Sequence, residues 1–364
     1  MAIFFFPTEA SIVDPTMSQL AAATTMLNPR KRAAATAAQA LQAHATYTYT
    51  FGDVAENHAR NQQIGAIAAE GFSAADLRAA QSKFESRGLT CTLVDLGALD
   101  AYVLVVRQPL AVLGTTADDL QAEIAAHEPD KKVFMYGRVV NKHARWNLCM
   151  AEAAQDPDYD SGKGTVLAFD SLPHLKAVRE ALPAFVGPKA SALFAELNVY
   201  YDPAKCGIGY HGDTERRKVI AFRLGATMPL FYQWFQNGAP RGARIAVPPL
   251  HHGDMYIMSQ KAVGTDWKLR KIPTLRHAAG CDKFTVYKGA AVATTVAATE
   301  AAATEAAATE AAATEAAEVA TSLVEGSHAS KGKIAVSAAS QGEKVAVAAA
   351  TDADEDAGEQ EEEN

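Results

Sequence analysis

The feature that most constrains the fold lies between Glu196 and Lys288. There, short apolar or alternating segments are separated by Gly, Pro and Asp. They cover residues 196–201, 207–213, 218–225, 229–235, 243–248, 255–259, 274–278 and 283–288. Closely spaced segments of this kind predict short strands in a sandwich or barrel. We therefore expect a mainly β chain with flanking helices.

The segment 71–130 predicts a lead-in of helices and strands packed on this core. Ser73 and Asp76 have capping-box spacing and Gly88 suits a helix end, so residues 73–88 predict a helix. Hydrophobic periodicity predicts further strands at 89–96, 101–110 and 133–140, and helices at 116–127 and 171–187. The core domain is predicted to span residues 131–290.

The two ends of the chain have biased compositions. Residues 1–70 begin with an Ala- and Thr-rich stretch, which predicts a disordered leader. Residues 291–364 contain the repeated segment Ala-Ala-Ala-Thr-Glu and end in an acidic run. Ala and Glu favour helices, so we expect a helical spacer followed by a disordered acidic tail.

Charge is segregated along the chain. Residues 131–290 carry 23 Lys/Arg against 13 Asp/Glu, whereas residues 291–364 carry 3 against 15. The basic middle favours an anionic partner. The cysteines are far apart and form no C-x-x-C pair, which indicates reduced thiols and an intracellular protein of the nucleus or cytoplasm. No run of apolar residues is long enough to predict a membrane span.

The triplet His-Gly-Asp occurs twice, at residues 211–213 and 252–254. On a strand, residues two apart share a face, so His211 and Asp213 can present an imidazole and a carboxylate together. Among the histidines beyond the second triplet, only His277 precedes the tail. Together, His211, Asp213 and His277 would complete the two-histidine, one-carboxylate set that is typical of non-haem Fe(II) oxygenases. The second triplet instead predicts a turn in which Asp254 bonds backbone amides.

Residues 133–288 resemble the 2-oxoglutarate/Fe(II) dioxygenases of the AlkB type. The resemblance comprises Asn-Val-Tyr at 198–200, the triplet at 211–213, the strand ending in Leu-Gly at 224–225, the aromatic strand at 229–235 and the His-Gly-Asp turn ahead of His277. It implies a double-stranded β-helix (jelly roll) that binds Fe(II) through His211, Asp213 and His277. It also implies 2-oxoglutarate and O2 as co-substrates.

The resemblance further implies residues for the co-substrate. Asn198 and Tyr200 match the family's Asn-x-Tyr. In the family's last strand, an Arg followed two residues later by a polar residue binds the far carboxylate, and Lys283 with Thr285 is the nearest match. Lys288 is the alternative, although strand alternation would point it away from Lys283.

Nucleic acid, DNA or RNA, is the expected substrate. Cations at the mouth of a site can hold phosphates and aromatic rings can stack on a base. The substrate-binding residues predicted on this basis are Glu215, Arg216, Arg145, Tyr210 and Trp234. Four alternatives remain open: a protein side-chain hydroxylase, an oxygenase acting on a small molecule, a nucleic-acid-binding protein without turnover on the same scaffold, and a jelly-roll metalloprotein of another chemistry such as a cupin.

Overall fold

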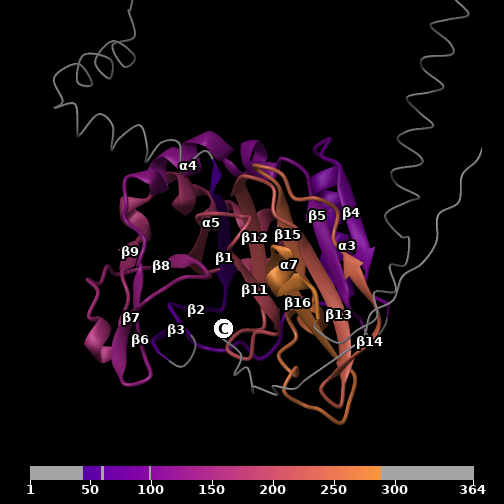
Figure 1. Cartoon of the computed structure of the whole chain (residues 1–364). Helices are drawn as coiled ribbons and strands as arrows, with labels where there is room; N and C mark the ends of the chain where they lie inside the picture. The colour runs from indigo at the N-terminus through magenta and orange to yellow at the C-terminus, as the bar shows by residue number, and fades with distance from the viewer. Residues whose placement is uncertain (1–43, 59–60, 98–99, 288–364) are drawn as a thin grey trace, which may run out of the picture. The chain divides into compact units, whose positions relative to one another are not determined.

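The computed structural model describes residues 44–58, 61–97 and 100–287, which all belong to one compact unit (Figure 1). The predicted spacer and tail, Lys288, and the first part of the predicted leader lie outside these residues. The described part is mainly β-sheet with a few helices, as expected from the sequence. None of its helices is both long and apolar enough to cross a membrane.

Most strands belong to two sheets (Figure 1). An eight-stranded sheet has the order β4-β5-β15-β12-β1-β10-β8-β9 and is antiparallel except at β8–β9. Its strands are β1 (Thr46–Gly52), β4 (Cys91–Asp95), β5 (Tyr102–Val106), β8 (Trp146–Ala151), β9 (Val166–Ala168), β10 (Phe194–Tyr200), β12 (Val219–Gly225) and β15 (Met255–Met258). A four-stranded antiparallel sheet has the order β11-β16-β13-β14. It comprises β11 (Gly207–His211), β13 (Leu230–Gln236), β14 (Ala239–Ala246) and β16 (Thr274–Gly280).

Two short hairpins stand apart from these sheets: β2 (Val54–Glu56) with β3 (Gln63–Gly65), and β6 (Lys132–Met135) with β7 (Arg138–Asn141). The helices are α3 (Ala74–Glu85), α4 (Ala117–Ala125), α5 (Pro173–Val186), α6 (Gln260–Val263) and α7 (Asp282–Thr285). Single 3-10 turns are η1 (Pro109–Leu113), η2 (Tyr159–Ser161), η3 (Phe169–Ser171) and η4 (Pro188–Ala190).

Two apolar cores lie on opposite faces of the eight-stranded sheet. On one face, alternate residues such as Tyr49, Leu197 and Phe222 pack against α3, α4 and α5. On the other face, residues such as Val105 and Ala221 pack against the four-stranded sheet. The order of layers is therefore helices, large sheet, small sheet, and the space between the two sheets receives every second side chain of the large sheet.

Strand β1 corrects the predicted leader of residues 1–70. It pairs with both β10 and β12, and all seven of its residues are buried. Its tyrosines and phenylalanine face the helices, while Thr46, Thr48 and Thr50 take the opposite face of the strand. A leader ending at residue 70 is wrong because this Thr/Tyr alternation buries both faces of a strand inside the sheet.

Other local predictions are confirmed or refined. Helix α3 begins with the reciprocal Ser73–Asp76 capping box. The single strand predicted at 133–140 is a hairpin, because Tyr136 and Gly137 both have positive φ (55° and 74°) and form its two-residue turn. The strand predicted at 283–288 is replaced by α7. The chain leaves the sheet at Gly280, whose φ of 113° and close approach to Gly207 end the ladder there.

Candidate metal centre

Strand pairing brings the two histidines of the candidate centre together. His211 is the last residue of β11 and lies directly opposite His277 of β16, and their rings are 4.4 Å apart between centroids. His277 shares its face of β16 with Leu275 and Ala279, which pack in the core between the sheets. Both imidazoles therefore come from the small sheet, and His277 faces the space between the sheets.

Asp213 joins them from the loop after β11. Its Oδ1 lies 3.4 Å from His211 Nε2 and 3.7 Å from His277 Nε2. The ligand atoms of the three residues all lie within 4.8 Å of one another. Two ligands with bonds of about 2.1 Å to one ion lie at most about 4.2 Å apart, so both nitrogen–oxygen distances suit a shared ion. The predicted convergence of these three side chains is found.

The second triplet forms the predicted turn. Asp254 accepts from the His251 amide at 2.8 Å and pairs with Arg107 at 2.5 Å. His252 Nδ1 accepts from the Gly225 amide. These contacts give Asp254 a structural role, so the two triplets differ as expected.

The ionisation states of the triad suit a cation. Burial, and then the nearby charge of His211, lower the pKa of His277 to about 3, so its imidazole is neutral at pH 7. Burial acts to raise the pKa of Asp213, but the His211 hydrogen bond and the charges of His277 and Arg216 lower it well below its usual range. His211 Nδ1 lies 2.7 Å from the Gly209 carbonyl, which can only accept, so Nδ1 donates there. A metal would then bind at Nε2, in place of the proton that Nε2 shares with Asp213 in the metal-free chain.

Gly212 allows the loop of Asp213 to approach its neighbour. The Asp213 amide donates to Val263 O at 3.0 Å, and a Cβ on Gly212 would lie 2.1 Å from Gly264 O. We expect Gly212→Ala to displace the loop, lower the free energy of unfolding by about 1–3 kcal/mol and weaken metal binding. Urea denaturation and metal titration measure both effects. Gly209→Ala is the control, because a Cβ there meets nothing within 4 Å and should change neither quantity.

Arg216 belongs to a buried ion-pair network and is not placed to hold a phosphate, contrary to prediction. It is 3% exposed, and its guanidinium lies 2.7 Å from Glu196, 3.1 Å from Glu215 and 3.7 Å from Asp213. Three carboxylates therefore already surround this cation. Burial, and then the charge of Asp213, raise the pKa of Glu215 to about 7. Arg216 and Glu215, which were predicted to bind substrate, instead lie in the ion-pair network beside the candidate metal ligand Asp213.

Tyr210 and Trp234 are engaged in packing, so the structure does not bring these two predicted stacking residues to the triad. The Tyr210 hydroxyl donates to Thr285 O at 3.1 Å and its ring packs on Phe235. Trp234 donates from Nε1 to Leu96 O at 2.6 Å. Tyr210 points away because it precedes His211 on β11 and takes the opposite face.

The prediction for Lys283 and Thr285 fails for a related reason. Both lie on α7 and not on a strand, so the alternation argument does not apply. Lys283 is exposed with its ammonium over the Phe284 ring, and the Thr285 hydroxyl donates to Cys281 O. Neither reaches the space between the sheets.

Asn198 and Tyr200 lie on the face of β10 that looks into the space between the sheets. Asn198 Oδ1 accepts from Arg145 Nε at 2.9 Å, and its amide donates to Glu196 at 3.1 Å. Tyr200 is buried, and this burial raises the pKa of its hydroxyl, while the charges of Arg145 and Arg223 oppose the shift. Of the predicted substrate residues, Arg145 is the one that contacts a predicted co-substrate residue.

Arg223 is the residue that the sequence reasoning missed. It is 1% exposed and alternates on β12 with Val219 and Ala221, which pack between the sheets. It donates to Thr48 Oγ1 at 2.7 Å, but its Nε is buried without a hydrogen-bond partner among the described residues. Those residues also provide no carboxylate within 4.0 Å of it. The sequence did contain a sign of this residue, because Arg223 is the single charged residue in the otherwise apolar segment 219–224.

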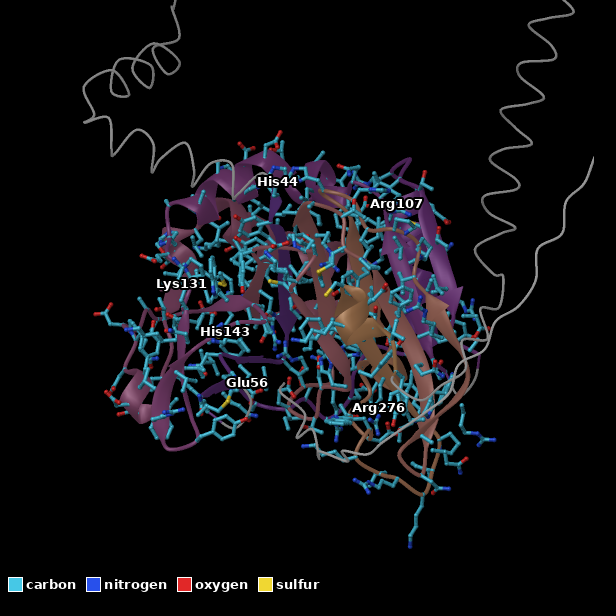
Figure 2. All side chains as sticks on the ribbon, viewed as in Figure 1. His44, Glu56, Arg107, Lys131, His143 and Arg276 are labelled. Atoms are coloured by element: carbon cyan, nitrogen blue, oxygen red, sulfur yellow. The ribbon has the colours of Figure 1, made fainter. Side chains whose placement is uncertain are left out.

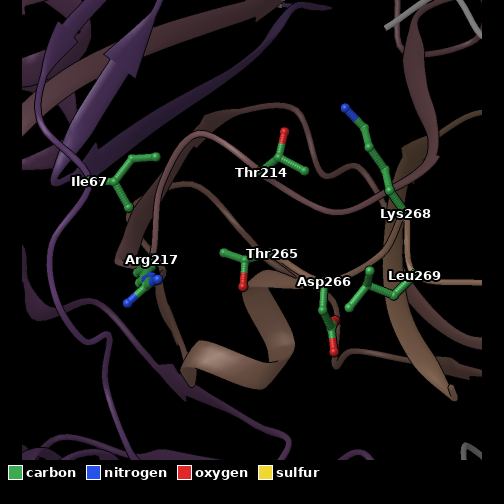
Figure 3. Close-up of a pocket in the computed structure, with 7 residues that line it drawn as sticks. All are labelled: Ile67, Thr214, Arg217, Thr265, Asp266, Lys268 and Leu269. Atoms are coloured by element: carbon green, nitrogen blue, oxygen red, sulfur yellow. The ribbon is translucent and has the colours of Figure 1, made fainter.

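A cavity of about 340 Å³ opens beside the loop of Asp213 (Figure 3). Thr214, the next residue, lines it together with Thr265, Arg217 and Lys268. The exposed side chains Ile67 and Leu269 add apolar surface. Asp266 also lines the cavity, so its wall carries charges of both signs beside the apolar surface.

Comparison with known proteins identifies a relative of the chain. No protein-family model matches the chain. A protein of Acanthamoeba polyphaga mimivirus, described as "Uncharacterized protein R156", is 47% identical over 249 residues. The match covers 66% of this chain and 97% of the viral protein. The chain therefore belongs to the family of this mimivirus protein.

Proposed function

We propose that the chain is an Fe(II)- and 2-oxoglutarate-dependent dioxygenase of the AlkB-like type, acting on a C–H bond of a nucleic-acid base. The observation that carries this proposal is the convergence of His211, Asp213 and His277 on one point. Two imidazole nitrogens and one carboxylate oxygen leave coordination positions open, which suits non-haem Fe(II).

The winding of the strands supports a double-stranded β-helix. Along the chain, β10, β12 and β15 join the large sheet, whereas β11, β13, β14 and β16 join the small one. A strand after β16 would next return to the large sheet, but α7 follows instead. β1 lies between β10 and β12, so we infer that this N-terminal strand takes the place of a last strand in the jelly roll.

This arrangement reassigns the partner of the far carboxylate of 2-oxoglutarate from Lys283 to Arg223. A buried charge is almost always paired, so a buried guanidinium without a carboxylate partner favours an anionic ligand. The Tyr232 hydroxyl is a second buried group without a partner among the described residues, and its ring lies 5.8 Å from that of His277. A ligand rich in oxygen atoms would satisfy both groups.

The residues of the chain have separable roles in this proposal. His211, Asp213 and His277 would hold the iron, and Arg223 with Tyr232 would orient the co-substrate. When bound there, iron and 2-oxoglutarate would supply the oxidising power for hydroxylation of a substrate C–H by O2, with succinate and CO2 as the co-products. His277 and Arg223 are buried, so the inner side of the site is dry, whereas His211 and Asp213 are partly exposed.

The test of this function is production of succinate from 2-oxoglutarate. The reduced full-length chain, loaded anaerobically with Fe(II), should form succinate when O2 and methylated oligonucleotides are added, and formaldehyde should accompany it if an N-methyl carbon is hydroxylated. Omitting Fe(II) should abolish both products. If no nucleic-acid, protein or small-molecule pool ever stimulates decarboxylation by the iron-loaded chain, the proposal is wrong.

A further inference from the structure

The hairpin β6–β7 exposes an aromatic ring at its tip. The hairpin pairs with neither large sheet, and Tyr136, the first residue of its turn, is 70% exposed. Its ring and hydroxyl have no partner among the residues that the structure describes. A turn with positive φ at both positions favours Asn-Gly, so Tyr136 is a poor choice for the turn itself. Local stability therefore does not explain this side chain.

The hairpin and its flanks are strongly basic. Residues 131–147 contain five Lys/Arg, one His, and no Asp or Glu. Lys132 and Arg138 are exposed and form no ion pair with the described residues. Figure 2 labels Lys131 and His143 on the side of the molecule where Figure 1 places β6 and β7. The turn η2 packs against β6 and β7 and brings the exposed Asp158 and Asp160 beside the arm, and Lys131 pairs with Glu128. Lys132 and Arg138 are therefore the cations of the hairpin that can bind a polyanion.

The base of the arm connects to the candidate site. Lys142 donates to Asn147 Oδ1, and Arg145 donates to Asn198 Oδ1. Asn147 of β8 and Asn198 of β10 lie directly opposite each other. Burial lowers the pKa of Lys142 to about 8; the charge of the nearby Asp130 opposes this shift, and that of Arg145 adds to it. Basic side chains therefore connect the exposed tip with the strand that carries Asn198 and Tyr200, although Lys142 among them is partly buried beside Asp130.

We propose that the β6–β7 hairpin is a docking arm for single-stranded nucleic acid, with Tyr136 stacking on a base and Lys132 and Arg138 binding phosphates. As a route to the candidate site it rests on the proposed function, but the binding itself needs no metal. Phosphate contacts supply affinity and stacking on an aromatic ring tolerates any base. An acidic peptide would use the cations but would leave Tyr136 without a planar partner.

Binding of a labelled oligonucleotide to the metal-free full-length chain tests the arm. Fluorescence anisotropy would follow single-stranded DNA and RNA probes of about 16 nucleotides, the upper end of common site sizes. Tyr136→Ala should weaken binding about tenfold, because stacking on one base contributes about 1–3 kcal/mol. Lys132→Gln with Arg138→Gln should reduce the slope of log K against log salt by about 1.4.

The matched control removes two cations elsewhere. Lys83→Gln, on α3, with Arg87→Gln, just after it, changes the net charge equally at a site away from the hairpin, and should leave the salt slope unchanged. The proposal is overturned if this control weakens binding as much as the hairpin variant, or if Tyr136→Ala binds normally. Binding of an acidic peptide but of no oligonucleotide would also overturn it. Hairpin-dependent binding by a chain that forms no Fe(II)/2-oxoglutarate complex would instead leave the arm standing and refute the oxygenase.

Discussion

Replacing His277 with alanine is expected to abolish Fe(II)-dependent turnover and to lower Fe(II) affinity by more than about 100-fold. Loss of an outer partner of a metal ligand already lowers affinity about 10- to 100-fold, and His277 would be a ligand itself. The remaining pair, His211 and Asp213, would keep only one nitrogen and one carboxylate oxygen. Anaerobic titration calorimetry with Fe(II) measures the effect directly.

The second His-Gly-Asp triplet provides the matched control for this substitution. His252→Ala removes the same side chain from a triplet whose aspartate pairs with Arg107, and Fe(II) affinity should not change. Fe(II) at about 100 times its Kd should stabilise the wild type by about 2.7 kcal/mol and should do the same for His252→Ala. If His277→Ala binds Fe(II) as the wild type does, the metal site lies elsewhere.

Replacing Arg223 with methionine is expected to weaken 2-oxoglutarate binding by at least about 30-fold. Removing one partner of a buried charge pair costs about 2–5 kcal/mol of binding free energy, which corresponds to at least that factor. Stability of the free protein should be unchanged or higher, because the substitution removes a buried charge without a carboxylate partner among the described residues. The KM for 2-oxoglutarate and a thermal melt of the ligand-free chain measure the two effects.

Two further variants separate the assignment from its alternatives. Arg223→Lys keeps the charge and should retain part of the affinity, although it loses the planar fork of the guanidinium. Lys283→Met tests the residue that the sequence favoured, and its KM for 2-oxoglutarate should equal that of the wild type because Lys283 lies exposed on α7. A high KM in Lys283→Met with a normal KM in Arg223→Met would reverse the assignment.

The local pattern of the sequence predicted β4, β5 and the strands from β10 to β16, but it missed β1, β8 and β9 of the large sheet. From β10 to β16, each predicted segment overlaps the observed strand, because one face of each strand is apolar and Gly or Pro interrupts the chain between them. The convergence of His211, Asp213 and His277 was also predictable, since few histidines offered a third ligand. In both cases the signal lay in spacing along the chain.

The remaining differences depend on tertiary contacts that spacing does not report. Thr48 looks polar in sequence, yet it is 6% exposed because β1 lies between two other strands. Lys283 left the predicted strand because Gly280 turns the chain out of the sheet. Arg223 lies on a predicted strand, but the sequence does not show whether a carboxylate from a distant segment pairs with its guanidinium. Residue type and alternation predict which face of a strand a side chain takes, but its contacts with distant residues depend on the tertiary structure.

The central claim, that His211, Asp213 and His277 bind one Fe(II) together with 2-oxoglutarate, is tested most directly by anaerobic titration. Fe(II) is added to the reduced full-length chain with 2-oxoglutarate present, and the visible absorption band of the complex is recorded. We predict a saturating band with one iron per chain in the wild type and in His252→Ala, and no band in His277→Ala. A wild-type chain that develops no band, or a His277→Ala chain that develops a normal one, would contradict the account.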